Sequence, residues 1–372
     1  MMLRPLLLPG LPRLWRGPHT LQLGLDPDRA VLFDLPHARV AQILDLMDGT
    51  RPERAVYAYG TSLGVAPDDV RVLVDALRAA GYLLSAPSLM PATLADDHRG
   101  RLLAEAAAVA LSAPAPLAGT PRPPAPTRRS PSPAQVLRRR LAACVIVAGA
   151  GRLGPPIAVA LAQSGIGHVH PQLSGTVSPA DLAGGPLHAD DIGQPAVAAT
   201  TAALQRAAPD TRTGPVRRGT ASLVVQLGFD QPVELLAARF AARRQPHLRV
   251  GLREATAIVG PLVPAAGRPC LNCLDLHRSD RDPQWPQLVR QAQPRVAEPC
   301  SVTTVLAATA YACAEVLAYL DGAAAQTVGA AVEIRGPGRV RRRAWPPHPA
   351  CMCHRPTGLS PRKSPEGNDT GR

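Results

Sequence analysis

Lysine is almost absent from this sequence. Lys363, near the end of the chain, is the only one, so 40 of the 41 basic residues are arginines. Aromatic residues make up 3% of the chain, and the arginines are scattered rather than gathered in one block. Bases would find few rings on which to stack, so the formal net charge of +13 indicates a solvated basic surface more than a nucleic-acid-binding one.

Long apolar runs and a disulfide framework are also missing. No apolar stretch reaches the roughly 20 residues of a membrane-spanning helix. The leucine-rich residues 1–15 are interrupted by prolines and precede no small-residue cleavage site, so they predict a strand entry rather than a signal peptide. Four of the seven cysteines stand in one Cys-x-x-Cys and one Cys-x-Cys pair, which fits a metal in a reducing cytosol. We therefore expect a cytoplasmic protein.

Residues 1–86 predict a small α+β domain of the winged-helix type. Alternating apolar residues over 21–25 and 30–35 predict strands. Helical apolar spacing then predicts helices over 40–47, 52–64 and 68–80. This order, with the sequence LMDGT between helices, resembles the PqqD-like peptide-recognition modules of ribosomal-peptide biosynthesis. An ordinary winged-helix domain fits the pattern equally well.

The rest of the chain divides by composition. Residues 87–135 hold a helical Ala/Leu stretch, about 93–111, and then a Pro-, Ala- and Arg-rich segment that predicts a semi-extended linker. Residues 136–355 alternate strand and helix patterns, which predicts an α/β domain with a Rossmann-like, doubly wound sheet. Residues 356–372 are polar and proline-rich, so we expect a disordered tail.

A glycine-rich turn follows the first strand of this predicted sheet. Gly149, Gly151 and Gly154 form Gly-x-Gly-x-x-Gly between the apolar run 144–148 and a helix, an arrangement that binds the phosphates of a nucleotide. These glycines are the candidate cofactor-binding residues. No Asp or Glu follows in residues 166–175 to hold a ribose hydroxyl, so ordinary NAD binding is disfavoured.

Five segments resemble, in the same order, the ThiF/MoeB/HesA family, relatives of ubiquitin-activating enzymes. They are residues 149–167, 176–198, 267–273, 312–322 and 348–353. The resemblance spans residues 140–354. It implies a ThiF-type fold that binds ATP and magnesium and adenylates the C-terminus of a carrier protein or peptide.

The positions that would carry this chemistry depart from the family pattern. The family's acidic ribose and magnesium ligands fall on Leu173, Ser174 and Gly175. Its phosphate-binding residues and its lysines fall on Asp181, Gly184, Gly185, Gln194 and Ala196. The late aspartate of its fourth strand has only Asp230, or Phe229 one place earlier, as a candidate. Losing one charge-stabilising group costs about two to three orders of magnitude in rate, so the sequence favours a retained scaffold without adenylation, unless another arginine replaces the missing groups.

The cysteine pairs predict a metal site. Cys270 and Cys273 fall in a predicted turn after a strand, and Cys351 and Cys353 close the domain. Four thiolates in two short pairs form a tetrahedral, structural zinc site with no position left for water. ThiF-type proteins have two Cys-x-x-Cys pairs here, so the shortened second pair makes His354 a possible substitute ligand. Free core cysteines are the alternative interpretation.

The segment between the two pairs, residues 274–300, predicts a polar loop that in the family crosses the sheet face where the partner's tail enters. Six of its side chains could contact a peptide or simply be solvated: His277, Arg278, Asp280, Arg281, Asp282 and Trp285. Cys300 stands just before a helix whose dipole could activate a thiol, although a buried cysteine is the simpler interpretation. Cys144 and Cys313 are expected in the core.

Three functions fit the sequence. The favoured one is a degenerate ThiF-type protein that binds a ribosomal precursor (leader) peptide and presents it to a cyclodehydratase-type enzyme, because a ThiF-type domain behind a PqqD-like module resembles the precursor-binding proteins of thiazole/oxazole-modified peptide pathways. The second is an active ATP-dependent adenylyltransferase, and the third is a winged-helix DNA-binding regulator. A homodimer is possible. For the first function we expect an open strand edge beside the helix 68–80 to bind the peptide, with Arg71 and Arg78 facing an acidic leader.

Overall fold

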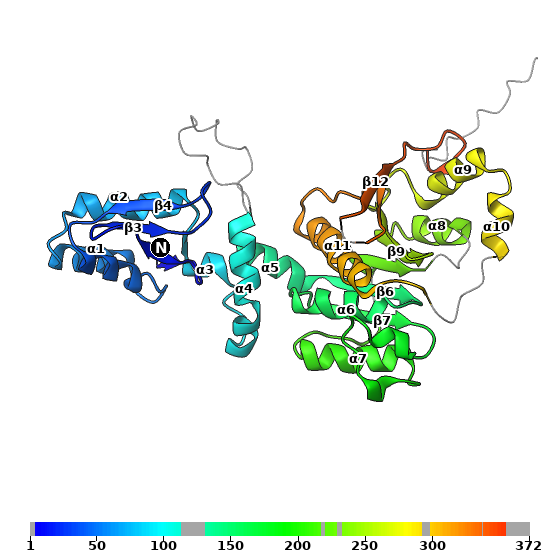
Figure 1. Cartoon of the computed structure of the whole chain (residues 1–372), viewed down its shortest axis with the longest axis horizontal. Helices are drawn as coiled ribbons and strands as arrows, with labels where there is room; N and C mark the ends of the chain where they lie inside the picture. Colours follow the sequence, from blue (N-terminus) through cyan, green and yellow to red (C-terminus); the bar gives the residue numbers. More distant parts are fainter. Residues whose placement is uncertain are drawn as a thin grey trace, which may run out of the picture.

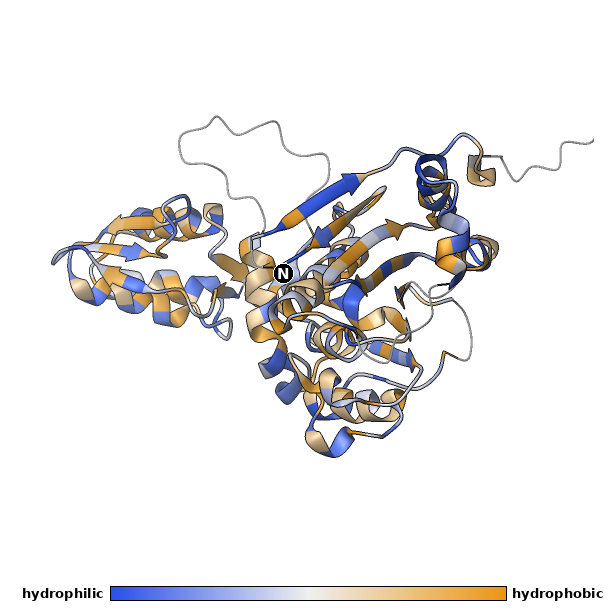
Figure 2. Ribbon diagram, turned by 45° about the vertical axis from the view of Figure 1, so that its right-hand side comes forward, coloured by the Kyte–Doolittle hydropathy of each residue, from blue (hydrophilic) through white to orange (hydrophobic). Residues whose placement is uncertain are grey.

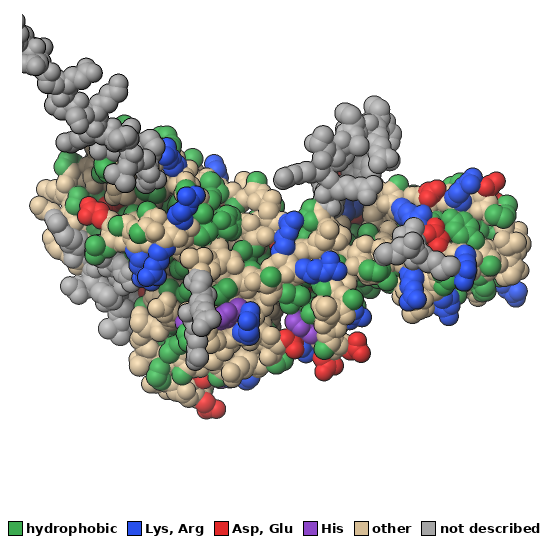
Figure 3. All heavy atoms as spheres, turned by 180° about the vertical axis from the view of Figure 1, so that it is seen from behind, with side chains coloured by type: hydrophobic (Ala, Val, Ile, Leu, Met, Phe, Trp, Pro, Cys, Tyr) green, Lys and Arg blue, Asp and Glu red, His purple; other side chains and the backbone are tan. Residues whose placement is uncertain are grey.

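The computed structural model describes residues 4–112, 131–216, 220–228, 233–291, 298–336 and 338–354. The chain forms an N-terminal α+β part and a larger α/β part, with helices α4 and α5 lying between them (Figure 1). On the face drawn in Figure 3, basic side chains are spread over both parts rather than gathered in one patch.

The N-terminal part contains two small antiparallel sheets and a set of helices. Its strands are β1 (Pro5–Leu7), β2 (Arg13–Trp15), β3 (Thr20–Leu23), β4 (Val31–Asp34) and β5 (Leu83–Ser85). Its helices are η1 (Ala38–Leu46), α1 (Glu53–Ser62) and α2 (Pro67–Ala79). β1 pairs with β5, and the other three strands form a sheet in the order β2-β3-β4, so β4 is an edge strand. The two predicted strands and the strand entry at the start of the chain are present.

The first predicted helix of this part is a 3-10 helix rather than an α-helix. Val40, Ile43, Leu44 and Met47 are all buried, as their spacing predicts. Steps of three residues satisfy the three-residue repeat of a 3-10 helix as well as the 3.6-residue repeat of an α-helix, so the apolar pattern could not separate the two.

Helix α2 ends as its sequence predicts. Its apolar face, from Val70 to Leu77, is buried. Gly81 has φ +76°, and the amides of Gly81 and Tyr82 donate to the carbonyls of Arg78 and Leu77. A left-handed glycine and these two bonds form a Schellman motif, which satisfies carbonyls left open at the helix end.

The arginines on α2 are less free than the sequence suggests. Arg78 pairs with Glu53 at 2.7 Å and lies 3.5 Å from Asp75, while Arg71 pairs with Asp68 at 2.9 Å. An acidic ligand would have to compete with these carboxylates. The expectation that the two arginines face an acidic leader stays a prediction.

Three helices follow the N-terminal part: α3 (Ala86–Leu89), α4 (Asp96–Ser112) and α5 (Pro133–Ala142). The predicted helical stretch over 93–111 is α4, and residues 113–130 of the predicted linker lie outside the described residues. Leu102 and Ala106 of α4 pack with Leu137 of α5 and with Leu8 in one apolar cluster. This cluster, together with ion pairs described below, fixes α4 against the α/β part.

The described strands of the α/β part form a seven-stranded sheet in the order β12-β11-β10-β9-β8-β6-β7. They are β6 (Cys144–Gly149), β7 (His168–Leu173), β8 (Leu223–Leu227), β9 (His247–Arg253), β10 (Thr256–Val263), β11 (Ala330–Ile334) and β12 (Val340–Ala344). β6 to β9 pair in parallel, and β10 to β12 continue the sheet antiparallel. This Rossmann-like α/β sheet confirms the predicted fold class.

Helices cover both faces of this sheet. They are α6 (Gly154–Gln163), α7 (Ala196–Ala207), α8 (Val233–Ala242), α9 (Leu271–Arg281), α10 (Trp285–Gln291) and α11 (Val302–Asp321). In β6, Val145 and Val147 belong to the core shared with α6, α7 and α11, whereas Cys144 and Ile146 pack on the cluster that includes α8. Successive residues of a strand point to opposite faces, so the alternation in β6 serves two helical layers.

The long helix α11 and the hairpin of β11 and β12 close the domain. Among the described helices, α11 is long and apolar enough to cross a membrane, and 44% of that stretch is buried where it packs against α6 and β10. β12 pairs with β11 antiparallel as the second strand of this hairpin. Its arginines make it a hydrophilic edge strand, which protects the sheet from pairing with another chain (Figure 2).

Candidate functional site

The glycine-rich turn follows β6, at the point where the order of the strands in the sheet reverses. β6 is flanked by β7 on one side and β8 on the other, so the chain leaves β6 for one neighbour and later returns to the opposite one. In open α/β sheets, ligands bind outside the carboxyl ends of the strands at such a switch point. The turn from Gly149 to Gly154 occupies that position.

At each of the three glycines of the turn, a side chain would be strained or would clash with a neighbour. Gly149 and Gly151 have φ of +115° and +123°. A Cβ on Gly149 would lie 2.7 Å from the carbonyl oxygen of Leu227 on β8, and one on Gly154 would lie 2.9 Å from the side chains of Leu173 and Leu227. The glycines therefore let helix α6 pack closely on the strand ends.

The turn holds a carboxylate of its own chain. The backbone N–H of Arg152 donates to Oε2 of Glu298 at 3.0 Å. A Cβ on Gly151 would lie 2.8 Å from the same oxygen, so the carboxylate lies directly against the turn. A negatively charged group thus takes a backbone donor that a phosphate would otherwise use.

The start of helix α6 offers few other donors to an anion. Pro155 and Pro156 have no N–H, and the N–H of Gly154 donates to the carbonyl of Gly151 at 3.2 Å. Anion binding at a helix N-terminus depends on free backbone N–H groups aimed at the ligand. The sequence of this turn keeps the glycines and removes much of that donor set.

Arg152 is the arginine within the turn. Its Nη1 donates to the carbonyls of Glu298 and Cys300 at 3.3 and 3.0 Å, and its side chain is buried. Its buried Nε has no hydrogen-bond partner within the described part of the chain. Arg152 therefore holds the segment before α11 against the turn and has one donor to spare.

The positions that match the family's catalytic residues have structural roles here. The N–H of Ser174, at the end of β7, donates to the carbonyl of Gly149 at 2.9 Å, and Leu173 is buried against Gly154. Asp181 accepts from the backbone and hydroxyl of Ser178, both at 2.7 Å.

The remaining matched positions lie in the same region. Gln194 donates to the carbonyl of Asp190 at 2.9 Å. The N–H of Ala196 donates to the carbonyl of Gly175. Val302 lies close to Gly184, and Gly185 donates to the carbonyl of Leu182. Asp230 and Phe229 lie outside the described residues.

A second candidate site brings the four predicted cysteines together. Sγ of Cys270 lies 3.9 Å from that of Cys273 and 3.6 Å from that of Cys351, and Sγ of Cys273 lies 3.4 Å from that of Cys353. Zn–S bonds of about 2.3 Å in a tetrahedron put sulfurs about 3.8 Å apart. The cluster has the spacing of a four-thiolate metal site, and it could hold a metal ion.

The position of the first pair differs from the prediction. Cys270 and Cys273 do not lie in a turn: Cys270 is the N-cap of α9, and Cys273 lies in its first turn. Leu271, Cys273 and Leu274 are buried, so apolar contacts anchor the N-terminal end of α9. The side chain of His354 is not among those described, so its role as a ligand stays a prediction.

Polar contacts fix the second pair relative to α9. Nε2 of His348 lies 2.8 Å from a carboxylate oxygen of Asp280, and Nε2 of His277 lies 2.9 Å from the carbonyl of Pro346. The N–H of Cys351 donates to the carbonyl of His348 at 3.0 Å. Helix α9 therefore positions both ends of the cysteine cluster.

The pKa values of the thiols differ because the surroundings of the cysteines differ. Burial raises the pKa of Cys270 to about 11, a cost that a bound metal cation would offset because metals bind thiolates. Although burial opposes it, hydrogen bonds to its sulfur lower the pKa of Cys351 to about 7. Burial also raises the pKa of Cys300, Cys144 and Cys313. The raised pKa of Cys300 does not favour an activated thiol.

The predicted polar loop between the cysteine pairs is largely helical. Helices α9 and α10 cover residues that the sequence assigned to a loop, and residues 292–297 lie outside the described part. The buried residues of α9, Leu271, Cys273 and Leu274, all lie in its first turn, and the rest of the helix is mostly polar, so no apolar repeat runs along it to predict a helix.

Comparisons with known proteins agree with this architecture. Residues 132–224 match the sequence model of the ThiF family. The structure of E. coli MccB with ATP is similar with a TM-score of 0.62 and 13% identity, over 94% of this chain and 99% of MccB. The microcin C7 biosynthetic enzyme MccB in complex with N-formylated MccA gives 0.61 and 14% over the same shares. The structure of PaaA gives 0.59 and 15%, over 90% and 98%. None of the curated proteins compared with the chain matches it in sequence.

The match to the family model and the similarity to solved structures agree on one fold. The chain has the ThiF-type, adenylyltransferase-like fold, as the order of its motifs predicts. At 13 to 15% identity these neighbours establish the fold, and the chemistry must come from the residues of this chain. The PqqD-like character of the N-terminal part stays a prediction.

Proposed function

We propose that this chain binds a ribosomally made precursor peptide and presents it to a separate modifying enzyme of the cyclodehydratase type, without adenylating the peptide. One observation carries the proposal: the carboxylate of Glu298 accepts the Arg152 amide at 3.0 Å in the glycine-rich turn. A carboxylate there repels a triphosphate, and the two prolines of α6 leave few donors to compensate.

The peptide part of the proposal rests on the neighbours and on an exposed strand edge. MccB has been crystallised with selenomethionine-labelled MccA, so its ligand there is a polypeptide. In this chain β4 is the edge of its sheet, lies next to α2, and exposes 49% of Leu32. An extended peptide can add to such an edge by main-chain hydrogen bonds. Because Arg71 and Arg78 are paired, we expect the leader's apolar side chains to contribute more than its charge.

The other parts of the proposal follow from the same sites. A four-thiolate zinc ion at Cys270, Cys273, Cys351 and Cys353 would be structural, since the four thiolates leave no coordination position for a substrate. Thiolates of this kind persist in a reducing compartment, which fits the cytoplasm.

Nucleotide binding is the first test. We expect the wild-type chain to show no saturable binding of Mg-ATP by calorimetry and no peptide-dependent ATP–pyrophosphate exchange. Glu298→Gln removes the competing charge, so its affinity for ATP should rise about tenfold or more. Glu234→Gln removes one exposed carboxylate on α8 and serves as the matched control. ATP–pyrophosphate exchange by the wild-type chain would contradict the proposal.

Peptide binding is the second test. The full chain would be used to select peptides from a display library, and a selected peptide would then be titrated by fluorescence anisotropy. Leu32→Glu should weaken binding, whereas Leu235→Glu, at a position 69% exposed on α8, should not. Equal affinity of both variants would exclude the β4 edge. Binding of duplex DNA in place of peptide would favour the regulator.

An active adenylyltransferase is the second candidate, and Arg152 favours it. The unpartnered Nε of this arginine could bind a phosphate if Glu298 left the turn. If the wild-type chain shows ATP–pyrophosphate exchange and the Arg152→Gln variant does not, the chain is an active adenylyltransferase instead.

A further inference from the structure

A cavity of about 210 Å³ lies between helices α9 and α10 and the antiparallel strands of the sheet. Its lining includes four arginines and two of the chain's three tryptophans: Arg253, Arg278, Arg281, Arg343, Trp285 and Trp345. The arginines come from α9 and from two separate strands, β9 and β12. No residue of the glycine-rich turn lines it.

The cavity carries more positive than negative charge. Glu333, 6% exposed, lies 3.6 Å from Arg343 and 3.9 Å from Arg253, and Arg335 approaches it from outside the cavity at 3.5 Å. These separations are longer than those of hydrogen-bonded ion pairs, which are 2.7–2.9 Å as a rule. The carboxylate of Glu333 is therefore shared loosely by three guanidinium groups. Asp282 is the other acidic lining residue, so two carboxylates lie among four lining arginines and do not neutralise the cavity.

The two arginines of α9 add charge without an ion pair of their own. Within the part of the chain that the structure describes, neither Arg278 nor Arg281 has a carboxylate within ion-pair distance. Arg278 lies over the ring of Trp285 at 5.2 Å, and burial, followed by the charge of Arg253, lowers its pKa. Arginines in a last helical turn interact favourably with the helix dipole, but that effect does not account for the arginines on the strands.

The cavity lies over the part of the sheet formed by β9 to β12. Arg253, at the end of β9, is at the carboxyl edge that also carries the glycine-rich turn, whereas Arg343 and Trp345 lie toward the opposite end of the strands. Two strand spacings separate β6 from β9 and four separate it from β11, about 10 and 19 Å. A ligand held beside Glu333 and Arg343 would therefore not overlap with the turn.

We propose that this cavity binds a compact oxyanion of the phosphate type: inorganic phosphate, pyrophosphate or the phosphate end of a nucleotide. Several guanidinium forks that converge from three elements match the oxygens of a phosphate group, each by paired N–H donors. A multiply charged anion would also relieve the repulsion among the arginines. Trp285 is already covered by Arg278, so the site recognises the anion rather than a stacked base.

Tryptophan fluorescence of the full chain tests this directly. In a Trp15→Phe variant the remaining tryptophans both line the cavity, so saturable quenching by phosphate or pyrophosphate would report binding there. Binding should weaken as salt rises, because exposed charges are screened. Titration with AMP separates the sources: equal affinity for AMP and phosphate indicates a free oxyanion, and tighter binding of AMP indicates a nucleotide.

Variants locate the site. Arg281→Gln should weaken phosphate binding about tenfold or more. Arg342→Gln removes the same charge from the other face of β12, where its guanidinium donates to Gln326, and should leave affinity unchanged. Glu333→Gln should raise the affinity, because it removes the competing carboxylate, and this gain cannot arise from misfolding. An absence of saturable quenching, equal loss in both arginine variants, or a response only to a polyglutamate peptide would each overturn the proposal.

Discussion

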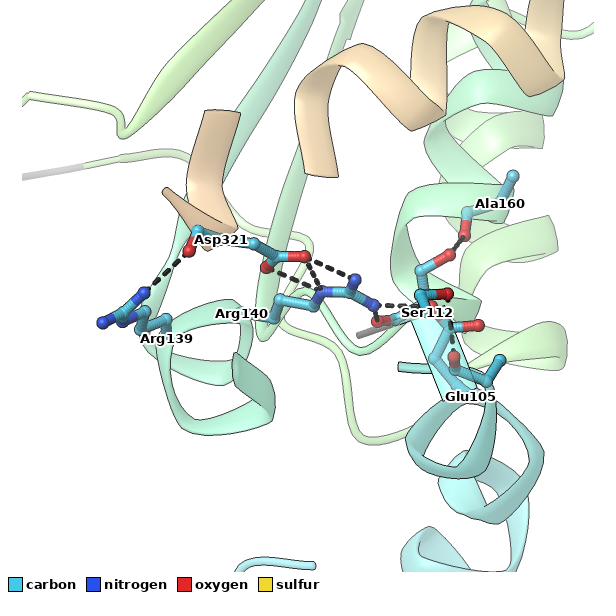
Figure 4. A network of polar contacts seen from close by, with 8 residues as sticks. Glu105, Ser112, Arg139, Arg140, Ala160 and Asp321 are labelled. Atoms are coloured by element: carbon cyan, nitrogen blue, oxygen red, sulfur yellow. Dashed lines mark hydrogen bonds and ion pairs between the residues drawn. The ribbon is translucent and has the colours of Figure 1, made fainter. Parts of the chain in front are cut away.

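Replacing Arg140 should weaken the junction of α4, α5 and α11 and destabilise the chain. Arg140 lies on α5 with its side chain 5% exposed, and it connects three elements (Figure 4). Its Nε and Nη2 donate to the two carboxylate oxygens of Asp321, at the end of α11, at 2.9 and 2.6 Å. Its Nη1 donates to Glu105 of α4 at 2.6 Å and to the carbonyl of Ser164 at 3.1 Å.

The magnitude follows from burial. Burial alone would lower the pKa of Arg140, but the hydrogen bonds to Asp321 and Glu105 outweigh it and raise the pKa. Removing one partner of a buried ion pair costs about 3–5 kcal/mol, because the other charge stays buried and unpaired. Asp321, 17% exposed, carries most of this cost. The carboxylate of Glu105 is 33% exposed and screened by water, so Glu105→Gln should cost about 1 kcal/mol or less.

Thermal unfolding of the full chain would measure the difference. Arg140→Ala should lower the midpoint by roughly 10 °C, at about 2–4 °C per kcal/mol for a domain of this size. Arg139→Ala is the matched control: the neighbouring, exposed arginine donates only to the backbone carbonyl of Asp321 and should change the midpoint little. Hydrogen exchange should rise in α4 for Arg140→Ala alone. Equal midpoints for the two variants would refute the assignment of a buried, stabilising network.

Two further predictions concern the metal and pH. Purified protein should contain about one zinc per chain, and Cys270→Ser should lose both zinc and stability while Cys300→Ser keeps both; metal analysis without zinc would contradict the site. Burial lowers the pKa of His247 from 6.5 to about 4. Between these two values the unfolded chain binds a proton on His247 more readily than the folded chain does. The free energy of unfolding should therefore fall by about 3 kcal/mol as the pH drops from 6.5 to 4. His247→Phe, which keeps the ring stacked on Phe240, should flatten the urea midpoint over this range, and an unchanged slope would show that other groups titrate.

Much of the fold was predictable because the signals are local. In β6 the apolar run precedes glycines with positive φ, and in α2 the apolar face and Gly81 mark both the helix and its end. The four cysteines were predictable as a set because only short pairs had to meet. Helix α9 was missed because its N-cap is Cys270 rather than Ser, Thr, Asp or Asn, and because its buried residues lie only in the first turn, which leaves no apolar repeat along the helix.

The decisive features of the glycine-rich turn and of the arginine-lined cavity depend on contacts that sequence patterns do not reveal. Glu298 reaches the glycine-rich turn from 146 residues beyond Arg152, and the arginines of the cavity are brought together by the antiparallel pairing of β9 to β12 and by the packing of α9 over these strands. A chain in which 40 of 41 basic residues are arginines gives no sign of which of them converge. Pattern methods detect periodicity within an element, and these contacts join different elements.

The glycine-rich turn and the arginine-lined cavity should respond to substitution independently of each other, and this can be tested. At the glycine-rich turn a carboxylate occupies the anion position, while the cavity beside Glu333, four strand spacings or about 19 Å away, is lined by more arginines than carboxylates. Sites that far apart with no shared partner should respond additively to substitution. If Glu298→Gln restores ATP binding at the turn, Arg281→Gln should leave that gain intact while it weakens phosphate binding in the cavity. A gain that disappears in the double variant would instead mean that a single nucleotide spans the turn and the cavity, with its phosphates held by the arginines.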